Sequence, residues 1–183
     1  MSRINNTLYA ILGILAQGPR SGYDIRKRFD ESLRFFWSES YGQIYPMLKH
    51  AVSQGYAEQI ASGGPRNKKL YRITAEGEAE FRRWLAVPVN PISYRDELLL
   101  RIYLAGSEDA DAIASLLSKE RDGLESGLAV LRAQEEQAER LYRGRAAPPW
   151  MMTLRYGILS GEARLRWCEE SLRSLEINRE NEV

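Results

Sequence analysis

Residues 40–55 carry the clearest pattern of apolar and polar positions in the first half of the chain. Apolar side chains recur there three or four residues apart, which predicts a helix with one buried face made of Ile44, Met47, Leu48, Ala51 and Val52. The opposite face holds small or polar residues and no carboxylate, namely Gly42, Pro46, Lys49, His50 and Ser53, with Gln43 and Tyr45 on its flanks. A helix held by its back, with short polar groups in front, suits the major groove of DNA. The pattern by itself suits an ordinary amphipathic surface helix equally well.

Two shorter helices are predicted before this segment. The first begins near Asn6, ends before Gly18, and buries leucine and isoleucine side chains at positions 8, 11, 12 and 15. The second begins at Ser21, where Asp24 has the spacing of an approximate capping box, and its buried side includes Ile25. The aromatic cluster at residues 35–37 is interpreted as core packing rather than as a ligand site.

A β-hairpin is predicted after residues 40–55. Residues 56–62 and 69–73 are typical of short strands, and residues 63–68 between them are turn formers and cations. Three helices followed by a basic hairpin form a winged helix-turn-helix. Thr74 is expected to cap a further helix, whose apolar side comprises Phe81, Trp84 and Leu85.

The second half of the chain is predicted to be helical. Pro88 and Pro91 mark a boundary, so residues 1–87 are predicted as a winged helix-turn-helix DNA-binding domain and residues 88–183 as a helical dimerisation domain. Residues 97–105 are apolar nearly all round, as expected for a short buried helix. Residues 109–142 predict a long charged helix with leucines seven residues apart, although the companion row is interrupted at Glu120, Gly127 and Gln134.

The most regular pattern of the chain follows in residues 151–175. Eight positions alternate three and four apart, the spacing of a coiled-coil seam: Met151, Leu154, Ile158, Gly161, Leu165, Cys168, Leu172 and Leu175. Gly161 leaves a gap where another helix can approach closely. The two long helices predict an antiparallel hairpin, and apolar surface that it cannot bury alone favours pairing with a second chain over an intramolecular three-helix bundle with residues 97–105. The predicted fold is mainly α with a small β-hairpin.

Charge is distributed unevenly along the 183 residues. The formal net charge is only +1, but residues 1–87 have 13 Lys and Arg against 8 Asp and Glu, whereas residues 88–183 have 13 against 17. This asymmetry indicates that the first half is the part that meets a polyanion. The absence of an 18-residue apolar run and of a signal-peptide pattern at the start predicts a cytoplasmic protein with no membrane association.

The sequence offers little for catalysis or metal binding. It contains one histidine and one cysteine, no glycine-rich phosphate loop and no cluster of metal ligands, so no catalytic, cofactor-binding or metal-binding residue is predicted. His50 is expected to face solvent or DNA, and Cys168 to lie on the helical seam. A single cysteine also excludes an internal disulfide and fits a reducing compartment.

Four segments of the first half form a recognisable set: Leu8–Leu15, Gly18–Ile25, Gly42–Leu48, which contains Ile-Tyr-Pro-Met-Leu, and Lys69–Gly77. Together they resemble the PadR family of transcriptional regulators. A weaker likeness around residues 155–158 and 165–167 is similar to the branch with a long C-terminal helical domain, the AphA-like virulence-activator type. The resemblance implies a homodimeric winged-helix repressor or activator, often released from its operator by a small-molecule effector. It places the recognition helix at about Ser40–Gln54 and the wing tip at Gly63–Lys69.

The resemblance and the helix pattern together predict eight DNA-binding residues: Ser40, Tyr41, Gln43, Tyr45, Lys49, Arg66, Asn67 and Lys68. Gln43, Tyr45 and Lys49 would face the major groove, and the cations of the wing would meet the adjacent backbone or minor groove. The helix N-termini at Ser21 and Ser40 could offer backbone N–H groups to phosphates.

Two alternatives stay open at this point. Ser40 and Gln43 have the spacing of a capping box, which explains Gln43 as well as a base contact does. The predicted function is a homodimeric repressor acting on a pseudo-palindromic operator of double-stranded DNA, with an effector that the residues do not identify. The alternative is a winged-helix protein-interaction module without DNA binding, against which the basic tip and the carboxylate-free helix face argue.

Overall fold

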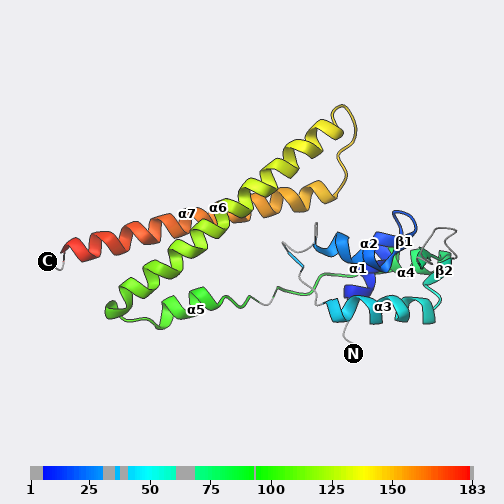
Figure 1. Cartoon of the computed structure of the whole chain (residues 1–183), viewed down its shortest axis with the longest axis horizontal. Helices are drawn as coiled ribbons and strands as arrows, with labels where there is room; N and C mark the ends of the chain where they lie inside the picture. The colour runs from blue at the N-terminus through cyan, green and yellow to red at the C-terminus, as the bar shows by residue number, and fades with distance from the viewer. Residues whose placement is uncertain (1–5, 31–35, 38–40, 61–68, 93, 182–183) are drawn as a thin grey trace. The chain divides into compact units, whose positions relative to one another are not determined.

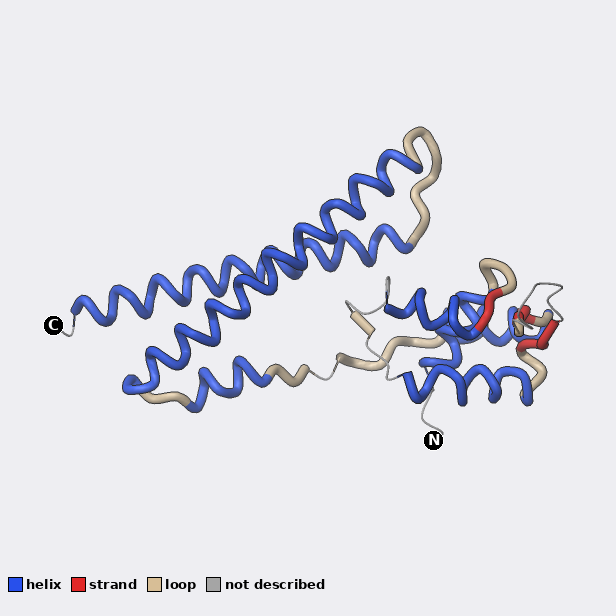
Figure 2. The backbone as a smooth tube through the Cα atoms, viewed as in Figure 1, coloured by secondary structure: helices blue, strands red, loops and turns tan. Residues whose placement is uncertain are grey.

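The computed structural model describes residues 6–30, 36–37, 41–60, 69–92 and 94–181. The chain divides into two compact units, residues 1–91 and residues 92–183, called here the N-terminal unit and the C-terminal unit. Figure 2 shows strands only in the N-terminal unit, while the described elements of the C-terminal unit are helices joined by loops. No described helix has the combination of length and apolar composition needed to cross a bilayer.

The described residues of the N-terminal unit form four helices and a small antiparallel sheet, which are labelled in Figure 1. The helices are α1 (Asn6–Leu15), α2 (Gly22–Arg28), α3 (Tyr41–Ser53) and α4 (Ala75–Leu85). The strands are β1 (Arg20–Ser21), β2 (Ala57–Ile60) and β3 (Leu70–Ile73), in the order β1-β3-β2. The predicted hairpin is therefore the larger part of a three-stranded sheet. The prediction missed β1, because a two-residue strand is defined by its distant partners Leu70 and Tyr71 rather than by a pattern of its own.

The core of the N-terminal unit forms where α1, α2 and α3 meet. Side chains from all three helices are almost completely buried there: Ile11, Leu12, Leu15, Ile25, Ile44 and Leu48. Phe29 and Ala57 extend the same cluster toward the end of α2 and the start of β2. This confirms the buried faces predicted for the first three helices, and the burial of apolar area holds each helix in place.

Local caps set the boundaries of α2 and α4. Ser21 is the N-cap of α2 and forms the predicted capping box with Asp24. Thr74 is the N-cap of α4, where its hydroxyl oxygen accepts the N–H of Gly77 at 3.0 Å and its hydroxyl donates to the Gly55 carbonyl at 2.6 Å. A Cβ on Gly77 would lie only 2.0 Å from the Tyr56 carbonyl oxygen, so only glycine fits at this junction between α4 and β2.

Aromatic side chains fasten α4 to α1. The rings of Tyr9 and Trp84 stack with centroids 4.9 Å apart, and the Tyr9 hydroxyl donates to Glu80 at 2.9 Å. Burial, together with the Glu80 carboxylate, raises the pKa of Tyr9 to about 12. Phe81 and Trp84 thus form the predicted apolar side of α4, but Leu85 was placed there wrongly, because 62% of it is exposed at the end of the helix.

The C-terminal unit is built around two long helices. Helix α5 (Glu97–Leu104) and a short 3-10 helix, η2 (Ser107–Asp109), lead into α6 (Ala110–Leu141) and α7 (Trp150–Asn181). Figure 1 shows α6 and α7 as an antiparallel pair, as the seam pattern predicts. Gly161 is the site of close approach: a Cβ there would lie 2.9 Å from Cδ2 of Leu128 on α6.

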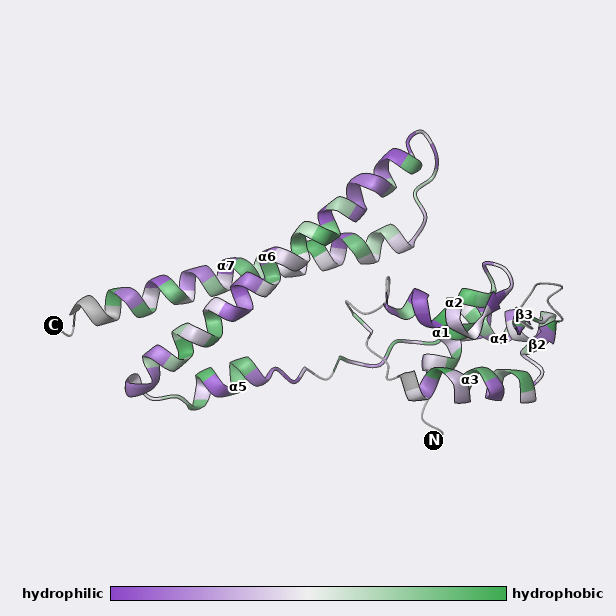
Figure 3. Ribbon diagram, in the orientation of Figure 1, coloured by the Kyte–Doolittle hydropathy of each residue, from purple (hydrophilic) through white to green (hydrophobic). Residues whose placement is uncertain are grey.

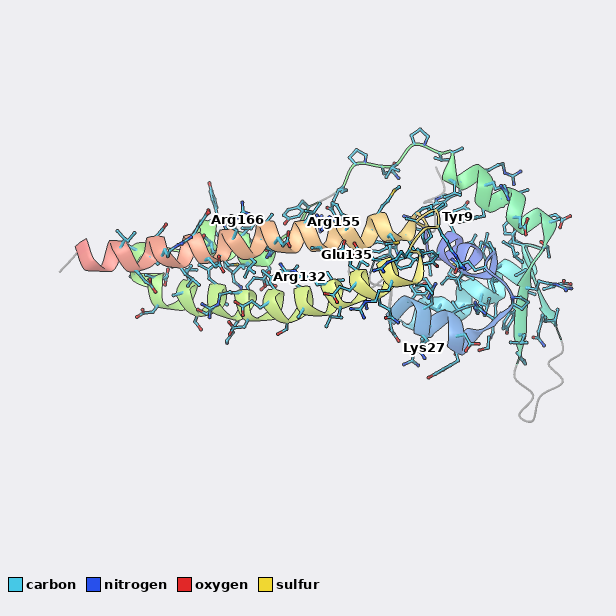
Figure 4. All side chains as sticks on the ribbon, turned by 90° about the horizontal axis from the view of Figure 1, so that it is seen from above. Tyr9, Lys27, Arg132, Glu135, Arg155 and Arg166 are labelled. Carbon is cyan, nitrogen blue, oxygen red and sulfur yellow. The ribbon has the colours of Figure 1, made fainter. Side chains whose placement is uncertain are left out.

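Ion pairs cross the hairpin formed by α6 and α7. Arg132 pairs with Glu162 at 2.9 Å, and Arg155 with Glu135 at 3.6 Å, with the labelled residues spread along the two helices in Figure 4. These pairs are largely exposed, so each adds little to stability. They mark the polar flanks of a seam whose centre is apolar, with Leu131 and Ile158 buried in it.

A less exposed ion-pair cluster joins three segments of the C-terminal unit. Arg164 of α7 contacts both Glu120 of α6 and Asp96, the N-cap of α5. The hydrogen bond from Arg164 lowers the pKa of Asp96, whose carboxylate also accepts the N–H of Leu99 at 3.2 Å. Glu120 therefore interrupts the apolar row of α6 because it faces this guanidinium.

Helix α5 forms where it was predicted but is not buried. Leu99, Leu100, Tyr103 and Leu104 are all exposed, and Tyr103 is 85% exposed. Ile102, on the other side of α5, packs against the small cluster of Ile113, Leu117 and Cys168. The prediction of a buried helix was wrong for the single chain, because one α6–α7 hairpin covers only one side of an almost wholly apolar helix.

Candidate nucleic-acid interface

Helix α3 presents the polar face that the sequence predicts. Ile44 and Ala51 are fully buried beneath it, whereas five residues on the opposite side are exposed: Gly42, Pro46, Lys49, His50 and Ser53. Gln43 and Tyr45 are exposed as well. The residues of α3 include no carboxylate, so nothing in the helix itself repels a phosphate.

Pro46 lies in the interior of α3, on its exposed side. Proline has no N–H, so the carbonyl of Gly42 four residues earlier cannot receive its usual helical hydrogen bond. Water or a bound partner can reach that carbonyl because Gly42 is exposed. The missing helical hydrogen bond therefore lies where it destabilises the helix least, and the free Gly42 carbonyl is an additional hydrogen-bond acceptor on the outward face.

Tyr45 lies at the edge of this face and packs on the first residue of α2. The nearest atom to an ideal Cβ on Gly22 is Cε1 of Tyr45 at 2.6 Å, and Cδ1 and Cζ of the same ring are each 3.4 Å away. About half of Tyr45 remains exposed, at 47%. Tyr45 is thus shared between the outward face of α3 and the contact between α2 and α3, a role that the helix pattern did not indicate.

The start of α2 differs from the sequence-based expectation. This helix N-terminus was expected to offer backbone N–H groups to a phosphate, but the N–H of Ser21 donates to Asp24 at 3.1 Å, and the Ser21 hydroxyl donates to the same oxygen at 2.7 Å. The Asp24 carboxylate also places negative charge where a phosphate would have to sit. Cations follow in the last turn of α2, where Lys27 is on the outer side of the helix (Figure 4).

The described residues of β2 and β3 include one ion pair, and an exposed lysine precedes β3. Glu58 of β2 and Arg72 of β3 are partners in the register, and their side chains meet at 2.7 Å. Lys69, immediately before β3, is exposed. The positive charge that the sequence assigns to the wing therefore rests on Lys69 and on the tip.

Several predicted contact residues lie outside the described residues. They are Ser40, before α3, and Arg66, Asn67 and Lys68, at the tip between β2 and β3. Tyr41 is the first residue of α3, but its side chain is also outside the described part. The structure thus brings Gln43, Tyr45 and Lys49 together on one helix. Among the described residues there is no group of three or more His, Cys, Asp and Glu side chains placed to hold a metal ion.

Comparison with known proteins matches both units to families. Residues 11–83 match the transcriptional regulator PadR-like family, and residues 94–176 match the virulence activator alpha C-terminal family. The chain thus contains a PadR-like domain followed by a domain of the virulence activator alpha C-terminal type. The combination of the two matches confirms the resemblance seen in the sequence, including the virulence-activator type of the C-terminal helices.

Among curated relatives, this chain is similar to the negative transcriptional regulator PadR of Bacillus subtilis. The two are 38% identical over 119 residues, which span 61% of this chain and 65% of the relative. A probable transcriptional regulator of Mycobacterium tuberculosis is 28% identical over 93% of this chain and 98% of its own length.

Solved structures share the fold of the chain along its length. Bacillus subtilis PadR in complex with operator DNA has a TM-score of 0.82 at 27% identity, covering 95% of this chain and 99% of that one. The same protein in complex with p-coumaric acid has a TM-score of 0.73 at 28% identity, covering 94% and 99%. A PadR-like regulator from Bacillus cereus has a TM-score of 0.80 at 28% identity, also covering 94% and 99%. These likenesses confirm a winged helix followed by a helical domain.

Proposed function

We propose that this protein represses transcription by binding a pseudo-palindromic operator as a homodimer. The observation that carries the proposal is the exposed, carboxylate-free face of α3, backed by the fully buried Ile44 and Ala51. The complex of Bacillus subtilis PadR with operator DNA supports it, as does the description of that relative as a negative regulator. Residues 1–87 would bind DNA and residues 88–183 would hold two copies together.

Within this proposal, α3 enters the major groove. Lys49 contributes a charge, and Gln43 can donate and accept hydrogen bonds at base edges. Tyr41 and Ser40 at the start of the helix, and Arg66, Asn67 and Lys68 at the wing tip, would contact the sugar-phosphate backbone or the adjacent minor groove. Base contacts from α3 would supply specificity, and the wing would supply affinity that does not depend on sequence.

Dimerisation is supported by the apolar surface of the C-terminal unit. Four large apolar side chains on two helices of that unit are exposed: Leu100 and Leu104 on α5, and Met152 and Leu159 on α7. Figure 3 shows hydrophobic residues along α5, α6 and α7. Exposed apolar patches of this kind mark interaction surfaces, and closed pairing of two identical chains is the commonest way to cover them.

An effector that releases the protein from its operator belongs to the same proposal. Its support is the complex of Bacillus subtilis PadR with p-coumaric acid, and that compound is the first probe to test. Added to a preformed complex of this protein with its operator, an effector lowers the fraction of bound DNA. An inactive structural analogue added at the same concentration is the control.

The test of the proposed function is a gel-shift assay with DNA flanking the protein's own gene, at two salt concentrations. A sequence-selective complex that weakens with salt supports it, and the slope reports the number of phosphates neutralised. Replacing both Arg66 and Lys68 by Ala should weaken binding to all DNA sequences and lower the slope by up to about two. An unchanged slope would contradict the wing assignment. No selective complex at low salt would favour a protein-interaction module instead.

A further inference from the structure

We propose that Tyr45 is a positioning residue that fixes the packing of α3 on α2, and that its ring packs directly on the backbone of Gly22. Operator affinity then depends on the absence of a side chain at position 22, although that position need not touch DNA. This inference rests on the proposed function, because it concerns how the DNA-binding helix is held.

The contact between Gly22 and Tyr45 leaves no room for a methyl group. An ideal Cβ on Gly22 would be 2.6 Å from Cε1 of the ring. Non-bonded carbon atoms are most favourable about 3.5 to 4.0 Å apart, so an alanine would overlap the ring and force it to move. Gly22 is also buried, which prevents the added methyl from turning toward solvent.

The backbone does not require glycine at this position. Gly22 is the first residue of α2, and the glycines with positive φ among the described residues are Gly18, Gly55 and Gly144. Glycine is a poorer helix former than alanine because it loses more backbone entropy on folding. Gly22 is therefore explained by the ring packed on it and not by its own conformation.

The backbone around Gly22 is held in place by its neighbour Ser21. Ser21, the residue before Gly22, is 4% exposed, caps α2 through Asp24, and pairs with Leu70 in the sheet. Gly22 thus follows directly from the strand that joins β3 at the base of the wing. A ring resting there relates α3 to both α2 and the sheet, so moving it would change how α3 and the wing are placed together.

About half of Tyr45 is exposed, so a positioning role has to be distinguished from direct contact with DNA by substitution. A positioning role depends on the ring, and Phe supplies the same ring. Recognition through the hydroxyl would depend on the oxygen that Phe lacks. Tyr45→Phe should therefore keep operator affinity within about twofold if the ring acts by packing, whereas Tyr45→Ala should lower it about tenfold.

The decisive experiment is a double-mutant cycle on operator affinity with the full-length protein: wild type, Gly22→Ala, Tyr45→Ala and the double variant. We expect each single variant to bind about tenfold more weakly, the equivalent of a modest overpacking or truncation cost. Once the ring is gone, the methyl at position 22 has nothing to displace, so the double variant should match Tyr45→Ala within about twofold. Gly123→Ala on α6 is the matched control, because a Cβ there meets nothing within 4 Å and should leave affinity unchanged.

Thermal unfolding of each variant excludes simple loss of the fold. Wild-type affinity in Gly22→Ala would overturn the inference, as would losses that add in the double variant. Failure of Tyr45→Phe to bind would overturn it in favour of contact through the hydroxyl. If the wild-type protein itself forms no selective complex, the proposed function fails first and this inference falls with it.

Discussion

Among the described residues, the N-terminal unit buries its apolar side chains in a single cluster, whereas the C-terminal unit spreads them over two small ones. In the first, α1, α2 and α3 converge on Ile11, Ile25 and Ile44, all fully buried. In the second, one cluster surrounds Ile158 and the other surrounds Cys168, while the outer side of α5 stays exposed. Two helices packed along one line have little interior. The contrast indicates that one unit completes its core within the chain and the other completes it with a second copy.

The largest effect is expected when two charges are placed on the exposed side of α5, because this change tests whether a second copy covers that side. Leu100→Glu with Leu104→Glu should raise the dimer dissociation constant by about two orders of magnitude, because buried apolar contacts at an interface are worth roughly 2 to 4 kcal/mol. Operator binding should fall with dimerisation, since a monomer contacts only one half-site. Analytical ultracentrifugation and gel shifts measure the two effects.

A matched control puts the same charges on polar, exposed positions of α6. Ser115→Glu with Gln137→Glu adds two carboxylates to the same unit without touching the apolar side of α5. If the α6 variant remains dimeric and the α5 variant is monomeric, the result supports completion of the C-terminal core by a second copy. A dimer that survives the α5 charges would show that this surface is not where the second copy binds.

Arg164 tests whether the C-terminal unit relies on polar contacts to hold α5. Arg164→Met leaves the carboxylates of Asp96 and Glu120 without their cation and should destabilise the unit by about 1 to 3 kcal/mol, less than for a fully buried pair because the three groups are partly exposed. Chemical denaturation followed by circular dichroism measures the change. Arg166→Met, at an exposed position two residues away, is the control and should change stability little.

The same variant has a defined dependence on pH. Arg164 holds the pKa of Asp96 below its value of about 3.9 in unfolded chains, so the pair stabilises the fold above pH 4. That contribution disappears as pH falls through the lowered pKa. The difference in stability between wild type and Arg164→Met should therefore shrink below about pH 4. A difference that is constant from pH 7 to pH 3 would exclude Asp96 as the responsible carboxylate.

Substitution of Lys49 is expected to have the smallest effect, and it tests whether DNA binding depends on the N-terminal unit alone. Lys49→Ala should weaken operator binding by about tenfold and lower the salt slope by about one, as expected for one lost phosphate or base contact. Lys119→Ala, which removes an exposed cation from α6, should change neither. Salt titrations of the two variants side by side would show whether DNA binding belongs to the N-terminal unit alone.

Local patterns predicted much of the fold because their causes are local. The buried side of α3 follows from the spacing of Ile44, Leu48 and Ala51, and the starts of α2 and α4 follow from the caps at Ser21 and Thr74. Helix boundaries depend on hydrogen bonds between near neighbours, which a short window of sequence contains.

The features that were missed depend on distant residues. Arg164 meets Asp96 and Glu120 across 68 and 44 positions, and β1 exists only because β3 pairs with it. The packing of Tyr45 on Gly22 is likewise a tertiary contact, although a glycine at the start of a helix is a signal worth following. For α5, hydrophobicity indicated burial without specifying whether the covering surface comes from the same chain or from another. Of the candidate contacts, Gln43, Tyr45 and Lys49 share a helix as expected, while their roles toward DNA stay predictions.

The thiol of Cys168 can report on opening of the α6–α7 hairpin. It is fully buried against Ile113 and Leu117, it is the only cysteine of the sequence, and burial raises the pKa of its thiol. A thiol-reactive dye can label it only when α6 and α7 separate, so the labelling rate measures how often the hairpin opens. Because every labelled molecule must have opened this unit, the rate is insensitive to the N-terminal core. Its dependence on protein concentration would show how firmly a second copy holds the hairpin closed.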